Sequence, residues 1–240
     1  MQPKLPKIQE VDLKDKVVLV RVDHNVVKKG KIKDPYRIDE TMKTLLRIAI
    51  KGGKPILMTH VNRPRDKKSG EINASDSTSV TPIVDYLWQK YGIDMKIPEY
   101  EVSGTEGIKT IAKNVKPLIE MLKDGKFDGI YLPNTRWFAG EEAKDEKADN
   151  LAKELASLAD IYVNDAFGSW QPHVSTARIV EHIPSRAGML LQSEINNLEK
   201  VLHPDRPFLA AVAGAKFDTK IEPLKSIFKL SDHLILGGII

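Results

Sequence analysis

Cysteine is absent from this sequence, which excludes a disulfide framework and a thiolate metal site and is typical of a reducing compartment. Long apolar runs are also absent, so we expect no membrane-spanning helix and no membrane partner. The N-terminal residues 1–7 have no apolar core and do not resemble a signal peptide, so the cytoplasm is the expected location. Patterns for a Walker-type phosphate loop, a zinc protease (HExxH), an esterase nucleophile (GxSxG) and an EF-hand are missing, so these chemistries are not predicted.

Charge of either sign is not gathered into blocks. The chain has 37 Lys and Arg residues against 33 Asp and Glu residues, a net charge of +4 and a pI near 9.0. A basic balance would suit a nucleic-acid partner, but the acidic residues are interspersed and no arginine-rich block is present. The composition therefore favours a focused basic site for a small phosphorylated or carboxylated ligand, with no nucleic-acid partner expected.

Strands and helices are expected to alternate along most of the chain. β-Branched runs are separated by amphipathic segments of helical spacing, which predicts an α/β fold: a doubly wound, Rossmann-like parallel sheet over residues 1–184. A narrow apolar stripe opposite a polar face predicts an interdomain helix over residues 185–204. Residues 205–240 are predicted to begin a second α/β domain, with strands near 208–212 and 234–236. At about 36 residues this part is shorter than most units that fold alone, so it either packs on the first domain or begins a longer one.

Polar side chains follow four of the predicted strands. In an open parallel sheet, ligands bind outside the carboxyl ends of the strands. Taken singly, these residues fit Asx turns, a structural histidine and surface cations; at one sheet edge they predict a crevice for an anion, because arginine binds phosphate and carboxylate through two parallel hydrogen bonds. The residues are Asp23 and Asn25 after the first strand, His60 and Arg63 after the second, Asn134 and Arg136 after a third, and Asn164, Asp165 and His173 after a fourth, with Arg37 before the first helix.

Several of these motifs together resemble the phosphoglycerate kinase family. They occur in the family's order over essentially the whole sequence, but cover only the first half or somewhat more of the family's chain. The matching segments are Arg21-Val22-Asp23-His24-Asn25-Val26, Arg37-Ile38, Thr59-His60 with Arg63-Pro64, Asn134-Thr135-Arg136, the segment 162–168 (YVNDAFG), and Gly214-Ala215-Lys216 with Lys220.

The resemblance implies a hinged two-domain kinase, an ATP-binding transferase of glycolysis that is monomeric in its full-length form. Its N-terminal domain would bind 3-phosphoglycerate or 1,3-bisphosphoglycerate, and its C-terminal domain MgADP or MgATP. Asp23 and Asn25 would contact the hydroxyl and carboxyl end of the substrate, and Arg37 the transferring group. His60, Arg63 and Arg136 would bind the substrate's own phosphate, with His173 nearby. Lys216 and Lys220 would meet the nucleotide phosphates, Lys216 as a catalytic residue with Arg37, and Gly214, Gly237 and Gly238 would let the backbone approach the nucleotide. No protein metal ligand is expected among these residues.

The sequence departs from the family pattern at several points. The family has an aromatic residue at His24, a proline at Val27, glycines at Asn62 and Ala213, and an acid at Pro133. The loop after Gly168 is one residue short and lacks the family's phosphate-binding arginine. The family residues that hold adenine, ribose and magnesium lie beyond Ile240.

Three hypotheses follow. The leading one is reversible phosphoryl transfer between 1,3-bisphosphoglycerate and ADP, with triose binding expected to survive better than turnover if these residues are the whole polypeptide. The second is a catalytically silent module that keeps only the triose site. The third and weakest is nucleic-acid binding, which steep salt dependence would reveal.

Overall fold

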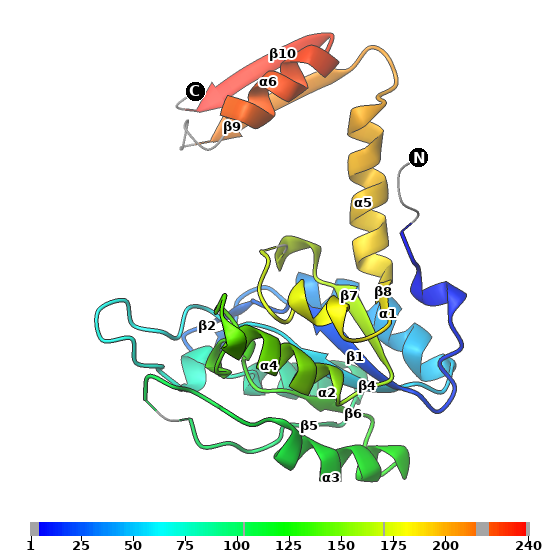
Figure 1. Cartoon of the computed structure of the whole chain (residues 1–240). Coiled ribbons are helices and arrows are strands. Elements are labelled where there is room, and N and C mark those ends of the chain that lie inside the picture. Colours follow the sequence, from blue (N-terminus) through cyan, green and yellow to red (C-terminus); the bar gives the residue numbers. More distant parts are fainter. Residues whose placement is uncertain (1–4, 103, 170, 215–220, 239–240) are drawn as a thin grey trace. The chain divides into compact units, whose positions relative to one another are not determined.

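The computed structural model describes residues 5–102, 104–169, 171–214 and 221–238 (Figure 1). Two compact units, Met1–Gln192 and Ser193–Ile240, divide the chain within helix α5 (Met189–Leu202). The predicted boundaries at residues 184 and 204 stay predictions, since α5 belongs to both units.

The first unit is built on a six-stranded parallel sheet with the strand order β5-β6-β4-β1-β7-β8. Strand β1 lies inside the sheet, and the chain adds strands first on one side of it and then on the other. This arrangement creates a topological switch point beside β1, where ligands of such sheets bind. The predicted fold class is confirmed. The strands are β1 (Val17–Val22), β4 (Lys54–Met58), β5 (Met95–Lys96), β6 (Gly129–Tyr131), β7 (Ile161–Asp165) and β8 (Ser185–Ala187).

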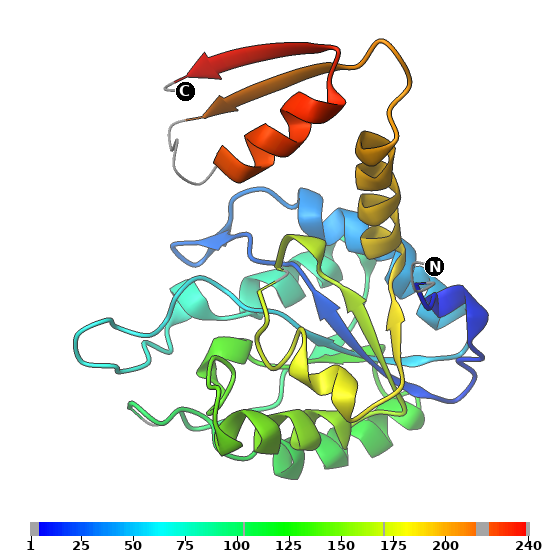
Figure 2. The same ribbon diagram turned by 45° about the horizontal axis from the view of Figure 1, so that its top comes forward.

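Helices cover both faces of this sheet, because its strands are apolar on both faces (Figure 2). Val18, Val20 and Val22 of β1 belong to the core under α1 (Tyr36–Ile50) and α2 (Thr81–Tyr91). Val17 and Leu19 belong to the core under α3 (Ala112–Lys123) and α4 (Glu146–Ala156). Strand β1 is therefore held from both sides, which fixes the position of the residues that follow it.

Helix α2 begins at Thr81, whose N–H donates to the Ser79 hydroxyl, and Val80 is its N-cap residue. Helix α3 continues through Pro117. The polar connection after β1 holds an unpredicted hairpin of β2 (Val27–Lys28) and β3 (Lys31–Ile32), closed by a Lys29-Gly30 turn with φ values of 51° and 72°. Short 3₁₀ helices complete the unit: η1 (Ile8–Glu10), η2 (Asp76–Thr78), η3 (Thr135–Trp137), η4 (Phe167–Ser169) and η5 (Arg178–Glu181).

The second unit contains a parallel pair of strands, β9 (Leu209–Gly214) and β10 (His233–Gly238), joined through α6 (Ile221–Leu230). Several of its large apolar side chains remain at least half exposed: Leu209, Phe228, Ile235 and Leu236. This unit therefore buries little apolar surface of its own. Among the described residues, no helix combines the length and apolarity needed to span a bilayer.

Asp165 at the end of β7 caps the start of α5. Its Oδ1 accepts hydrogen bonds from the backbone N–H groups of Leu190 and Leu191, at 2.9 and 3.1 Å. Burial raises the pKa of this carboxyl to about 6, against the lowering effect of these donors. We expect Asp165→Ala to lower the free energy of unfolding by about 1–2 kcal/mol, as loss of a helix cap does. Asp165→Asn keeps a hydrogen-bond acceptor, so urea unfolding should show a clearly smaller loss of unfolding free energy. Equal losses in the two variants would show that Asp165 does not stabilise the chain by capping α5.

Candidate functional site

The predicted substrate-binding residues follow the carboxyl ends of neighbouring strands. Arg21 of β1 is in register with Met58 of β4 and Asn164 of β7, and Leu57 with Tyr131 of β6, so these strands end at a common edge. The polar residues beyond the strands therefore lie at one side of the sheet. They are Asp23 and Asn25 after β1, His60 and Arg63 after β4, Arg136 in η3 after β6, and His173 beyond η4.

Asp23 and Arg37 form an ion pair at this edge. A guanidinium Nη1 of Arg37 donates to Asp23 Oδ2 at 3.0 Å, and the Ser169 hydroxyl donates to Asp23 Oδ1 at 3.0 Å. The Asp23 side chain is 8% exposed, whereas that of Arg37 is 53% exposed. A Cβ at Gly168 would lie 2.3 Å from Asp23 Oδ2, so only glycine fits beside the carboxylate. The carboxylate is thus fixed while the arginine keeps donors free for an anion.

His60 is held by the buried Arg21. The Nη2 of Arg21 lies 3.0 Å from His60 Nδ1, and because a guanidinium only donates, Nδ1 is the acceptor and Nε2 carries the proton. Burial lowers the pKa of His60 to about 3, assisted by the charges of Arg21, Arg136, His173 and Arg37. The imidazole therefore remains neutral near pH 7 and, with Nδ1 bonded to Arg21, offers its Nε2–H as a donor.

Arg21 itself was not predicted as part of the site. Its Nε donates to the Ser175 hydroxyl at 3.0 Å, and that hydroxyl donates to the buried Glu141 at 2.5 Å. Burial raises the pKa of Glu141, and the positive charge of Arg21 opposes that rise. The sequence contained one signal, a charged residue inside the β-branched run of β1, but Ser175 and Glu141 carried none.

Asn25, Asn62 and Arg136 form a second connected group. The backbone N–H of Asn62 donates to Asn25 Oδ1 at 2.9 Å, and Arg136 Nη1 donates to the Asn62 carbonyl at 2.6 Å. Arg136 Nε is also 3.2 Å from Glu142 Oε1, which lies 4.0 Å from His173 Nε2. Burial lowers the pKa of His173, and Glu142 opposes that effect. Arg136 is therefore held by a hydrogen bond to Asn62 and an ion pair with Glu142.

Arg63 differs from its neighbours because it is exposed and, within the described part of the chain, has no hydrogen-bond or ion-pair partner. All of its donors face solvent or a ligand.

His24, next to Asp23, is fully buried and satisfied on both ring nitrogens. The Thr41 hydroxyl donates to the Arg37 carbonyl at 3.0 Å, so it accepts from His24 Nε2, 3.1 Å away. The remaining nitrogen, Nδ1, then accepts from the Tyr131 hydroxyl at 2.9 Å. This network ties the start of α1, and with it Arg37, to β1 and β6.

We expect His24→Phe to flatten the acid limb of the stability curve. Burial lowers the pKa of His24 from 6.5 to about 3, so between these pH values the unfolded chain binds a proton that the folded chain does not. The contribution of neutral His24 to the free energy of unfolding is fully present above pH 6.5 and is lost as the pH falls towards 3. The slope of the unfolding free energy against pH should decrease by about 1.4 kcal/mol per pH unit in the variant. Urea unfolding at several pH values measures it, and parallel slopes for parent and variant would contradict the buried neutral state.

The predicted nucleotide-binding residues lie in the second unit. Gly214 ends β9, and it pairs with Gly238 of β10 as Ala213 pairs with Gly237. The three glycines therefore share the carboxyl end of one strand pair. Lys216 and Lys220 lie outside the described residues.

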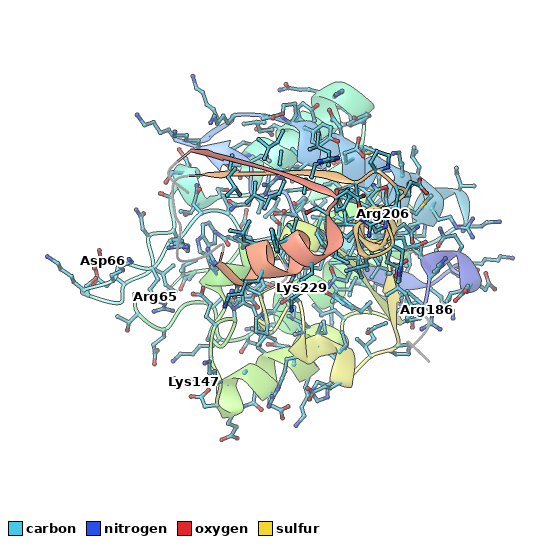
Figure 3. All side chains as sticks on the ribbon, turned by 90° about the horizontal axis from the view of Figure 1, so that it is seen from above. Arg65, Asp66, Lys147, Arg186, Arg206 and Lys229 are labelled. Atoms are coloured by element: carbon cyan, nitrogen blue, oxygen red, sulfur yellow. The ribbon has the colours of Figure 1, made fainter. Side chains whose placement is uncertain are left out.

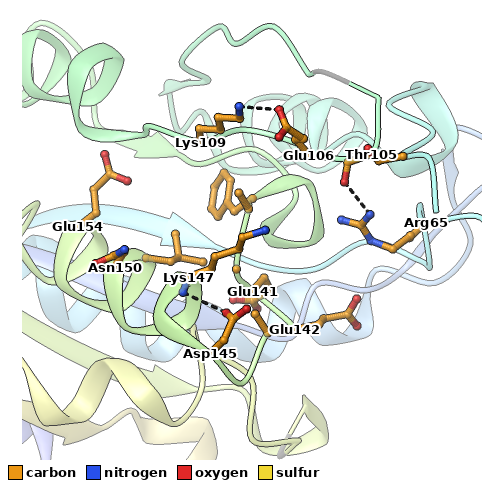
Figure 4. Close-up of a pocket in the computed structure, with 15 residues that line it drawn as sticks. Arg65, Thr105, Glu106, Lys109, Glu141, Glu142, Asp145, Lys147, Asn150 and Glu154 are labelled. Atoms are coloured by element: carbon orange, nitrogen blue, oxygen red, sulfur yellow. Dashed lines mark hydrogen bonds and ion pairs between the residues drawn. The ribbon is translucent and has the colours of Figure 1, made fainter.

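A cavity of about 910 Å³ contains none of the predicted site residues in its lining. It is lined by Arg65 of the 61–79 loop and by side chains from residues 105–109 and 138–154 (Figure 4); Arg65 and its neighbour Asp66 are labelled in Figure 3. Its charged groups are mostly engaged: Lys109 pairs with Glu106, Arg65 donates to the Gly70 and Thr105 carbonyls, and Glu154 accepts from the Ile111 and Ala112 N–H groups. A smaller cavity of about 430 Å³ is lined by Asn25, Lys28, Lys33, Arg37 and Asn62.

Comparison with known proteins shows the family of this chain. The family model described as phosphoglycerate kinase matches residues 8–240. The chain belongs to the phosphoglycerate kinase family. The structure of phosphoglycerate kinase from Coxiella burnetii is similar with a TM-score of 0.75 and 26% sequence identity, over 98% of this chain and 55% of that one. Phosphoglycerate kinase from Pyrococcus horikoshii OT3 shares the fold with a TM-score of 0.78 and 22% identity, over 98% of this chain and 56% of that one. The chain thus spans just over half the length of these phosphoglycerate kinases.

Proposed function

We propose that this chain binds 3-phosphoglycerate and 1,3-bisphosphoglycerate at the carboxyl edge of its six-stranded sheet, as the triose-binding part of a phosphoglycerate kinase. The observation that carries the proposal is a set of oriented donors beyond neighbouring strand ends: His60 is held by Arg21, Arg37 by Asp23, and Arg136 by the Asn62 carbonyl. We infer the identity of the ligand from the family to which the chain belongs. The reaction would be the reversible transfer of the acyl phosphate of 1,3-bisphosphoglycerate to ADP, in the cytoplasm.

The substrate's own phosphate would be bound by the neutral Nε2–H of His60 and by Arg63 and Arg136. Cationic donors suit a dianionic phosphate because charge-assisted hydrogen bonds are about twice as strong as neutral ones. Asp23 and Asn25 would contact the hydroxyl and carboxyl end. This division places the acyl end of the triose near Arg37, whose guanidinium is fixed on one side by Asp23.

Arg37 would stabilise the transferring group. Phosphoryl transfer spreads negative charge over equatorial oxygens and needs positioned cations rather than covalent chemistry from the protein. The half-exposed guanidinium of Arg37 has donors left after its bond to Asp23. It can therefore bind the oxygens of the phosphoryl group without losing its orientation.

The nucleotide would bind at the second unit, with Gly214, Gly237 and Gly238 beside it and Lys216 and Lys220 at its phosphates. Mg²⁺ would enter with ADP or ATP and neutralise phosphate charge. Within the described ranges no group of three or more His, Cys, Asp or Glu side chains is placed to hold a metal ion. The phosphates of the nucleotide would supply ligands to the ion.

Calorimetric titration of the chain with 3-phosphoglycerate tests the proposal. We expect saturable binding, and binding of glycerate, which lacks the phosphate, weaker by about 10-fold to 100-fold, the loss of one or two hydrogen bonds between charged groups. No binding, or equal binding of the two ligands, would contradict it. A coupled assay with MgATP then separates a kinase from a silent module, which binds the triose without turnover.

A further inference from the structure

We propose that Asn62 is a positioning residue of the triose site: its side-chain amide holds the backbone that orients both Asn25 and Arg136. The inference rests on the proposed function for its ligand, but its structural part stands on contacts alone. Asn62 lies between His60 and Arg63, and its side-chain amide donates to two backbone carbonyls, those of Val27 and Ser77.

The backbone of Asn62 adopts the left-handed conformation, with φ of 54°. Among residues with a Cβ, asparagine adopts it most readily, because its short polar side chain bonds locally. Here the side-chain Nδ2 donates twice, to the Val27 carbonyl at 3.0 Å and to the Ser77 carbonyl at 2.6 Å. One amide group thereby joins β2 of the hairpin to η2 of the 61–79 loop.

The same residue uses both of its backbone polar groups within the candidate site. Its N–H donates to Asn25 Oδ1, which leaves the Asn25 side-chain NH₂ as the group that faces away from Asn62. Its carbonyl accepts from Arg136 Nη1, which sets the plane of the guanidinium. Any shift of the Asn62 backbone therefore moves a donor that we assign to each end of the triose.

The family pattern has glycine at this position. Glycine reaches the same φ without strain but brings no amide, so the two bonds to Val27 and Ser77 are a property of this chain. These two hydrogen bonds restrict the backbone motion that a glycine would allow between Asn25 and Arg136. Asn62 is therefore expected to act on ligand affinity through Asn25 and Arg136.

A double-variant cycle tests the inference. Asn62→Gly removes the amide and keeps the backbone conformation accessible, and should weaken 3-phosphoglycerate binding about tenfold, equivalent to about 1.4 kcal/mol. Asn73→Gly is the matched control, an exposed asparagine of the same loop with no side-chain hydrogen bond in the described part of the chain, and should change affinity less than twofold. In an Asn25→Ala background only the route through Arg136 remains, so Asn62→Gly should lose part of its effect. Full effect in that background, or none in the parent, would overturn the inference.

Amide hydrogen exchange without ligand gives an independent reading. In Asn62→Gly the amides of residues 27–33, 62 and 76–79 should exchange faster than in the parent, whereas Asn73→Gly should leave residues 27–33 unchanged. Unchanged exchange in Asn62→Gly would refute the positioning role even if affinity fell. If the parent chain fails to bind 3-phosphoglycerate, the proposed function fails, and exchange still decides the role of Asn62.

Discussion

Arg37→Ala should lower phosphoryl transfer about a thousandfold while leaving the fold intact, because an arginine that stabilises the transferring group contributes at least this much to turnover. The side chain is 53% exposed and its loss opens no core cavity. Asp23 keeps the Ser169 hydroxyl as a partner and lies at the edge of the sheet. The measurement is the rate in the coupled assay with 3-phosphoglycerate and MgATP, relative to the parent chain.

Lys43→Ala is the matched control for Arg37→Ala. Lys43 belongs to the same helix, its side chain is 68% exposed, and it pairs with Glu40 at 3.6 Å. Removing it takes one positive charge from α1 without touching the sheet edge, so the rate should remain within about twofold, as for a surface ion pair. A loss of helical circular dichroism in Arg37→Ala would assign Arg37 a structural role, and an unchanged rate would remove it from the transfer step.

The second large effect is expected at Arg136. Arg136→Ala should weaken 3-phosphoglycerate binding about 100-fold, since a hydrogen bond between charged groups contributes up to about 3 kcal/mol. Arg136→Lys should recover only part of this loss, because an ammonium keeps the charge but cannot bind the Asn62 carbonyl and a phosphate with one rigid plane. Calorimetry gives the affinities.

Arg178→Ala is the control for Arg136→Ala. Arg178 is exposed on η5 and, among the described residues, has no hydrogen-bond or ion-pair partner. Its removal lowers the net charge equally and should leave affinity within about twofold. If both arginine variants weaken binding alike, the ligand responds to overall charge and the proposed contact is wrong.

The fold was predictable because its longer strands have a clear sequence pattern. Runs such as Val17–Val22 are β-branched, buried on both faces and followed by amphipathic helices, a pattern typical of parallel sheets. Strand β8 was missed because Ser185–Ala187 is only three residues long and two of these residues are polar. The β2–β3 hairpin was missed because a Lys29-Gly30 turn lacks the Asn-Gly or Asp-Gly signal of such turns.

The candidate site was predictable only where its residues directly follow strands. Asp23, His60 and Arg136 could be grouped from strand ends alone. The contacts that orient them come from far away in the chain: Arg21 reaches Ser175 across 154 residues, and Asn62 meets Arg136 across 74. A contact between residues so far apart leaves no periodic pattern in the sequence. Only the structure therefore shows which contacts orient the site residues.

A crystal structure of the chain with 3-phosphoglycerate would test the shared site most directly. We predict that the phosphate lies within hydrogen-bond distance of His60 Nε2 and of the Arg63 and Arg136 guanidinium groups, with the carboxyl end towards Asn25 and Arg37. A ligand bound instead in the 910 Å³ cavity of Figure 4, away from these five residues, would contradict the account.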